Sequence, residues 1–207
     1  MKNRARGYEP CMSSHANGST RTLAPLPIRA HPLVLGVVLF LASELMFFAA
    51  LFASYYDLRA NRGVWPPAAV HLRPAESTFG TFLLFVASLV MVLATHAMDR
   101  KNLKAARWWT ATAIVAAIGF VVVSVHGYVE DRFRIWSNAY GSIYYTMTGF
   151  HLIHVMVGIA ILTALLIGMR SPALRTNHRA GAEAMTYYWH FVFIVWIGIW
   201  TTIYFVR

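Results

Sequence analysis

The sequence predicts an all-α, polytopic membrane protein: a bundle of five transmembrane helices with a cytoplasmic N-terminus and an external C-terminus. Of its 207 residues, 58% are apolar and only 13% are charged, whereas soluble domains are about 45–50% apolar and about 25% charged. Five apolar runs are long enough to cross a bilayer, and 25 of the 26 Asp, Glu, Lys and Arg residues lie outside them. The basic residues also favour one side of the membrane, which sets the direction of the chain.

Each predicted span has close to the 20 or so apolar residues that a helix needs to cross a hydrocarbon core of about 30 Å. The spans are 33–56, 77–96, 108–126, 142–168 and 185–206. The loops between them are too short to fold a separate domain, so residues 31–207 should form one five-helix transmembrane domain. Residues 1–30 have no helical apolar period and no apolar core typical of a cleaved signal peptide. We expect them to form a cytoplasmic tail.

Charge distribution predicts the orientation and argues against a nucleic-acid partner. An odd number of spans places the termini on opposite sides, and the side of the N-terminus holds 12 Lys and Arg residues against 6 on the other. Because basic residues favour the cytoplasm, the N-terminus should lie inside. The net charge of +10 is spread over both faces of the membrane, so no basic patch suited to nucleic acid is expected.

Glu44 is the one charged residue inside a predicted span, at position 12 of 24. A charged side chain at this depth costs roughly 2.5–3.5 kcal/mol, so the carboxyl group should face protein or a polar cavity. Either it is a structural acid bonded to a neighbouring helix, or it handles protons, as in a small transporter. The chain lacks the inverted repeats and broken helices typical of transporters. His154 lies at the same depth in the fourth span, so we expect contact if the two helices face each other.

Three histidines lie within the last two spans. His151 and His154 are three residues apart and so share one helix face, and His190 lies on the fifth span. Such a set could bind a metal or haem, which would make the chain a membrane cytochrome. However, a single haem is usually bound from opposite sides by different helices. Hydrogen bonding to helices or lipid headgroups is therefore the favoured role.

The start of the fifth span carries a second polar pattern. Glu183, Tyr187 and His190 follow the spacing i, i+4, i+7, which predicts one polar stripe along the helix. Tyr187, Tyr188 and Trp189 also suit an aromatic belt at the membrane interface. That alternative explains His190 less well, because His190 lies deeper in the span.

Two further observations concern packing and catalysis. In the fourth span, small residues recur every four positions at Ala160, Ala164 and Gly168, which predicts a ridge for close packing of another helix. The sequence contains no Walker loop, nucleophile elbow, Gly-rich phosphate cradle or paired Asp/Glu motif. We therefore expect no catalytic centre in this chain.

Three ordered motifs resemble those of the cytochrome c oxidase subunit 3 family, subunit III of the haem-copper respiratory oxidases. They are LFLASELMFF at 39–48, AYGS at 139–142 leading into TGFHLIHVMVG at 148–158, and NHRAGAEA at 177–184 followed by YWHF at 188–191 and VW at 195–196. The resemblance covers nearly all of residues 33–207. Many bacterial members have five spans, which matches the number predicted here.

The resemblance implies a non-redox accessory subunit of a proton-pumping terminal oxidase in a bacterial cell membrane. Such a subunit packs against oxidase subunits I and II, binds phospholipid, and supports proton uptake and turnover stability of subunit I. Haem and copper belong to the partner subunits, and the oxidase can also sit in a respiratory supercomplex. Glu44 falls on the family's intramembrane glutamate. The residues expected in structural or lipid-cleft roles are His151, His154, Glu183, Tyr187, Trp189 and His190.

The chain departs from the family pattern at two places. Phe193 stands where members usually carry an acid after the Trp-His-Phe segment, and the usual Gln-x-x-Glu segment is altered to VHGYVED at 125–131, where Glu130 is the candidate for the family acid. These changes leave open subunit III of a quinol oxidase or a subunit-III-like protein of nitric oxide reductase. The Ser43-Glu44 pair favours the cytochrome c oxidase branch, because quinol-oxidase relatives tend to carry Asp there.

Overall fold

The computed structural model describes residues 32–62, 65–67, 73–131, 133–170 and 178–206, so the expected tail at 1–30 lies outside it. Every regular element in this part of the chain is an α-helix. The helices are α1 (Pro32–Ala60), α2 (Pro74–Asp99), α3 (Leu103–Glu130), α4 (Ala139–Gly168) and α5 (His178–Tyr204). Each coincides with one predicted span, which confirms the all-helical fold with five helices.

Helices α1 to α4 are long and apolar enough to cross a membrane. Helix α5 has 27 residues, which at 1.5 Å per residue is about 40 Å and exceeds the hydrocarbon thickness. Its Tyr, Trp, Thr and His side chains keep it below the apolar composition of the other four. The crossing of the membrane by α5 therefore stays a prediction.

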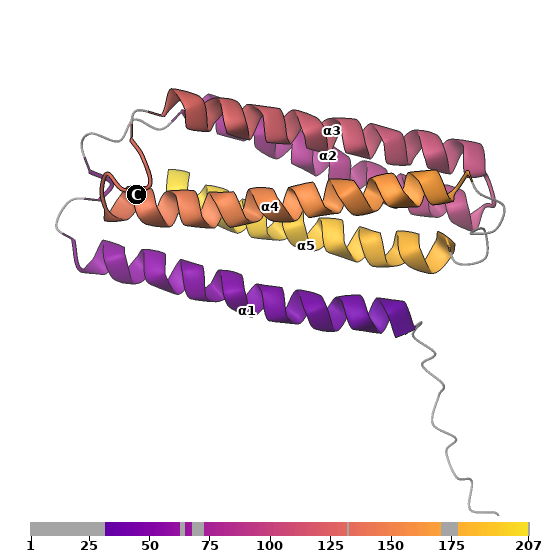
Figure 1. The fold of residues 1–207 in the computed structure, drawn as a ribbon, viewed down its shortest axis with the longest axis horizontal. Coiled ribbons are helices and arrows are strands. Elements are labelled where there is room, and N and C mark those ends of the chain that lie inside the picture. The colour runs from indigo at the N-terminus through magenta and orange to yellow at the C-terminus, as the bar shows by residue number, and fades with distance from the viewer. Residues whose placement is uncertain (1–31, 63–64, 68–72, 132, 171–177, 207) are drawn as a thin grey trace, which may run out of the picture.

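Consecutive helices run antiparallel, so the start of α1 and the end of α5 lie at opposite ends of the bundle (Figure 1). Helices α2 and α3 form a hairpin, and α5 packs against α1, α2 and α4. Helix α4 packs against α1, α3 and α5. This arrangement agrees with termini on opposite sides of a membrane, while the assignment of the inner and outer side stays a prediction.

The turn between α2 and α3 is short and built from local hydrogen bonds. Lys101 adopts a left-handed backbone conformation with φ 56°, which lets the Asn102 N–H donate to the Ala97 carbonyl oxygen at 2.9 Å. These bonds end α2 in the manner of a Schellman motif. The Asn102 side chain then accepts a hydrogen bond from the Ala105 N–H at 3.2 Å and caps the start of α3.

The AYGS segment closes the start of α4 against the preceding loop. The Asn138 side chain caps α4 by accepting a hydrogen bond from the Gly141 N–H at 2.7 Å, and the Ser142 hydroxyl donates to the Ile135 carbonyl oxygen at 2.6 Å. A Cβ atom at Gly141 would lie 2.5 Å from the Arg134 carbonyl oxygen. Glycine is therefore required here by the close approach of two backbones.

The core is apolar, and so is much of the outer surface. The largest buried side chains include Trp189, Phe120 and Met147, whereas Met46, Val115 and many other large apolar side chains point outward. Surface of this kind suits lipid or other membrane helices and is unusual for a soluble monomer. Helix α1 is the most open of the five, with only Phe48 and Tyr55 buried.

Candidate functional site

Glu44, His154 and Tyr188 join three helices near the middle of the bundle. The Glu44 carboxyl group on α1 lies 3.0 Å from the His154 Nε2 atom on α4. The Tyr188 hydroxyl on α5 donates a hydrogen bond to the His154 carbonyl oxygen at 2.7 Å. The equal depth of Glu44 and His154 in their predicted spans thus corresponds to a direct carboxyl–imidazole contact, as expected if α1 and α4 face each other.

The hydrogen bonds of His154 determine how many protons the pair holds. The Nδ1 atom lies 2.7 Å from the Phe150 carbonyl oxygen, which can only accept, so Nδ1 must carry a hydrogen. The contact at Nε2 then needs one more proton, either on the Glu44 carboxyl group or on the imidazole ring. In both forms the pair has zero net charge, which is the arrangement that costs least inside a membrane.

The pair lies in an apolar seam between α1 and α4. The ring of Phe48 stands edge-on to His154 at a centroid distance of 5.2 Å, and Phe47 packs on Phe150 at 5.0 Å. The side chains of Glu44 and His154 are still 22% and 14% exposed. The pair is therefore partly open to whatever surrounds the bundle at this depth.

The three histidines make separate contacts. His151 is fully buried and its Nε2–H donates to the Val192 carbonyl oxygen at 3.0 Å, while His190 donates from Nδ1 to the Thr186 carbonyl oxygen at 2.7 Å. Within the described residues, His151, His154 and His190 do not form a set of ligands within reach of one ion. Their contacts fit the favoured helix-bonding role.

The stripe predicted on α5 is not joined to Glu44. Glu183 and His190 are half-buried and Tyr187 is exposed, while Trp189 is fully buried. The residue that reaches α4 is Tyr188, which sequence reasoning had assigned only to an aromatic belt. The position of Tyr188 in the YWHF motif was the one feature of the sequence that could have indicated this contact. However, a tyrosine of an aromatic belt and a buried tyrosine cannot be distinguished from the sequence.

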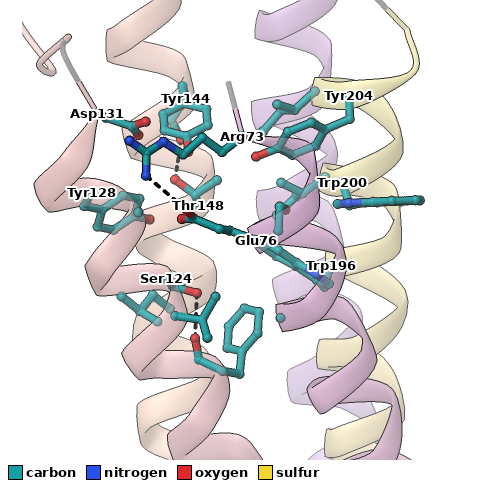
Figure 2. Close-up of a pocket in the computed structure, with 18 residues that line it drawn as sticks. Arg73, Glu76, Ser124, Tyr128, Asp131, Tyr144, Thr148, Trp196, Trp200 and Tyr204 are labelled. Carbon is teal, nitrogen blue, oxygen red and sulfur yellow. Dashed lines mark hydrogen bonds and ion pairs between the residues drawn. The ribbon is translucent and has the colours of Figure 1, made fainter. Parts of the chain in front are cut away.

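A second polar site, of which sequence reasoning named only Glu130, lies at the end of the bundle where α3 ends and α5 ends. Arg73 forms ion pairs with Glu76 and with Glu130, the candidate family acid. Asp131 follows directly and lines a cavity together with Arg73 and Glu76 (Figure 2). These acids had been assigned to loops because they lie outside the apolar runs. The available signal was that all of them fall on the same predicted side of the membrane.

Two acids of this second site, Glu76 and Glu130, share one cationic partner, Arg73. Carboxylate and imidazole atoms of Glu76, His126 and Glu130 lie within 4.8 Å of one another, the one group of this kind among the described residues. His126 lies 3.8 Å from each carboxylate, and the Arg73 guanidinium contacts both. The protein itself therefore supplies the positive charge that the two carboxylates need.

Four apolar helices of membrane-spanning length, an apolar outer surface and a half-buried carboxyl–imidazole pair define a multi-pass helical membrane protein. The pattern of the cytochrome c oxidase subunit III family matches residues 25–207. The chain belongs to the cytochrome c oxidase subunit III family.

Similar proteins come from bacteria and from mammals. The chain is 34% identical over 185 residues to cytochrome c oxidase subunit 3 of Corynebacterium diphtheriae, covering 86% of this chain and 90% of that protein. It is 36% identical over 183 residues to a probable cytochrome c oxidase subunit 3 of Nocardia farcinica, with the same coverage. It is 33% identical over 185 residues to cytochrome c oxidase subunit 3 of Oryctolagus cuniculus, covering 86% of this chain and 71% of the rabbit protein.

Proposed function

We propose that this chain is the non-redox accessory subunit III of a proton-pumping haem-copper terminal oxidase in a bacterial plasma membrane. In this role it packs against subunits I and II, which hold the haem and copper, retains phospholipid, and supports proton uptake and the working lifetime of subunit I. Its relatives are named cytochrome c oxidase subunit 3, which favours the cytochrome c oxidase type over a quinol oxidase or a nitric oxide reductase. The match with this chain covers 90% of the length of each of these two bacterial relatives, which favours a bacterial membrane.

The observation that supports this proposal best is that the three family motifs meet at one place. Glu44 of the first motif contacts His154 of the second, and Tyr188 of the third bonds to the His154 backbone. A Cβ atom at Gly158 would lie 3.0 Å from Tyr188 and 3.2 Å from Trp189, so the second and third motifs also interlock. The motifs therefore build a structural junction around one proton-holding pair.

The geometry of this junction suits a supporting role better than a catalytic one. Among the described residues, the His154 imidazole is hydrogen-bonded to Glu44 and to the Phe150 carbonyl oxygen, and the His154 carbonyl oxygen accepts from the Tyr188 hydroxyl. A relay would need a further titratable partner in line with the pair. The partial exposure of the pair beside the apolar rings of Phe47 and Phe150 suits ordered lipid chains along the α1–α4 seam.

The test compares the assembled oxidase with the same oxidase from cells that lack this chain. We expect similar initial rates of oxygen reduction, a shorter active lifetime during turnover, slower proton uptake, and fewer phospholipids detected by mass spectrometry when the chain is missing. The chain should co-purify with subunits I and II in mild detergent. Metal analysis of the isolated chain should find no stoichiometric iron or copper; one haem iron per chain would instead support the membrane cytochrome.

A further inference from the structure

The cavity at the second polar site is enclosed by four helices. It has a volume of about 60 Å³ and is lined by residues of α2, α3, α4 and α5. Arg73, Glu76, Asp131, Tyr144 and Tyr204 surround its mouth at the end of the bundle, whereas Trp196 lies two turns further in (Figure 2). From Tyr204 to Trp196 the helical rise is about 12 Å. The cavity is therefore a shaft with a charged mouth.

The floor of the shaft is closed by apolar and aromatic side chains. Phe120 and Trp196 pack edge-on at a centroid distance of 4.9 Å, with Leu152 beside them. The Trp196 N–H donates to the Thr81 hydroxyl at 2.8 Å, which holds the indole in place. Any small molecule in the shaft should therefore exchange through the mouth and not through the middle of the bundle.

Three buried polar atoms of the cavity lining have no hydrogen-bond partner in the protein. They are Glu76 Oε2, Asp131 Oδ2 and Trp200 Nε1. The contact of Glu76 Oε2 with His126 Nδ1, at 3.8 Å, is too long for a hydrogen bond. More than nine in ten buried polar groups in proteins are partnered by protein or ordered water. Unpaired atoms that line one cavity indicate that something in the cavity completes their hydrogen bonds.

The chemistry of these three atoms identifies the partner as water. The two carboxylate oxygens need a donor, while the Trp200 N–H needs an acceptor, and water provides both. A metal ion would satisfy the carboxylates and leave the indole N–H unpaired. A cavity of about 60 Å³ has room for several waters, because about 10–15 Å³ is enough to hold one. The hydroxyls of Ser124 and Thr148 donate to backbone carbonyls of their own helices, so they offer lone pairs to the same waters.

The charges around the shaft favour uptake of a proton. Two carboxylates, Glu76 and Asp131, line the shaft with one guanidinium, Arg73, which is shared with Glu130 outside it. Burial raises the pKa of Asp131, as does the negative charge of Glu76, although a hydrogen bond from Tyr144 and the charge of Arg73 lower it. The other titratable groups facing this region are Tyr128, Tyr145, Tyr204, Arg134 and His126.

We propose that this cavity is a hydrated proton-accepting site at the outer end of the bundle, where bound waters join Glu76, Asp131 and Trp200. A proton from the outer aqueous phase passes through these waters to a carboxylate oxygen of Asp131, which becomes a neutral carboxylic acid, and returns by the same route. The inference goes beyond the proposed function, because it requires neither lipid nor a contact with subunit I.

Hydration can be tested by hydroxyl-radical footprinting of the wild-type assembled oxidase, in which side chains beside bound water are modified rapidly. Tyr144 and Tyr188 are a matched pair, 8% and 5% exposed, but only Tyr144 lines the shaft. We expect Tyr144 to be modified several-fold faster than Tyr188. Equal and slow modification would overturn the proposal, as would a high-resolution map with an ion bound by both carboxylates.

Proton uptake can be tested by infrared spectroscopy of the assembled oxidase during pH titration. The wild type should show a carboxylic C=O band that shifts in D₂O and disappears only above the usual aspartate range. Asp131→Asn should remove this band, whereas Glu183→Gln, a change of a half-buried acid at the other end of the bundle, should keep it. A band that persists in Asp131→Asn would overturn the assignment. The footprinting test does not depend on this variant.

Discussion

At the scale of single residues, the position of Glu44 illustrates how burial selects a partner. A carboxyl group at the middle of a membrane helix must find a hydrogen bond at its own depth, because water is absent there. His154 satisfies this requirement at 3.0 Å. Since Nδ1 of His154 is bonded to a carbonyl oxygen, the pair retains one proton as a unit. A side chain that can donate to Nε2 should therefore replace Glu44 without disrupting the junction.

Replacing Glu44 tests whether the pair is structural or catalytic. Glu44→Gln keeps a donor for His154 Nε2, so we expect normal assembly and a normal initial rate of oxygen reduction, with at most slower proton uptake or a shorter active lifetime. Glu44→Leu leaves Nε2 unpaired at a cost of about 1–3 kcal/mol, so it should lower the thermal midpoint or lipid retention more. Oxygen consumption and lipid analysis measure both. A Gln variant that assembles but cannot reduce oxygen from the start would show that Glu44 is catalytic.

A second residue-scale prediction concerns the bond between α5 and α2. The Trp196 N–H donates to the Thr81 hydroxyl at 2.8 Å and is buried. Thr81→Val keeps the shape but leaves this N–H unpaired, so thermal unfolding of the assembled chain should reveal a loss of about 1–3 kcal/mol. Thr163→Val is the matched control, because the exposed Thr163 hydroxyl bonds only to the Ile159 carbonyl oxygen of its own helix. Equal effects of the two changes would contradict the assigned role of the Thr81 hydroxyl.

At the scale of helices, small residues mark a close contact, but not at the positions where their spacing is most regular. The ridge of Ala160, Ala164 and Gly168 is not where α5 packs, since Ala160 and Ala164 are exposed. The close approach lies two positions away from the regular pattern, at Gly158, which faces Tyr188 and Trp189. Regular spacing indicates that close packing is allowed on a face, whereas the bulk of the partner helix determines where it happens.

This contact predicts opposite outcomes for two glycines of α4. Gly158→Ala would place a Cβ atom 3.0 Å from the Tyr188 ring, and such overpacking costs about 1–3 kcal/mol. Gly149→Ala meets no atom within 4 Å, so it should be neutral or stabilising by about 0.4–1 kcal/mol. Thermal midpoints of the two variants measure the difference. A Gly149→Ala variant as unstable as Gly158→Ala would show that the helix backbone, and not the ring contact, is the cause.

At the scale of the whole molecule, the helices place apolar residues on the outside and charges at both ends. Because 12 basic residues lie on the side of the N-terminus and 6 on the other, Met1 should face the cytoplasm and Arg207 the outside. A label attached at the C-terminus should react with an impermeant reagent in intact cells, and one at the N-terminus only after lysis. If the C-terminal label were protected in sealed cells, the orientation would be the reverse of the predicted one, and the polar cavity would lie on the inner side.

The amino-acid sequence alone determined the five helices, their approximate bounds and the equal depth of Glu44 and His154. These follow from hydropathy along the chain, because each helix must cover a fixed thickness of hydrocarbon. The tertiary structure decided which helices are neighbours, that Tyr188 and not Tyr187 reaches α4, and that Glu76, Asp131 and Trp200 line one cavity. A helix that is apolar all round has no polar stripe to show which face is buried. Its rotation and partners therefore depend on side-chain packing across the bundle, which the order of residues in one helix does not reveal.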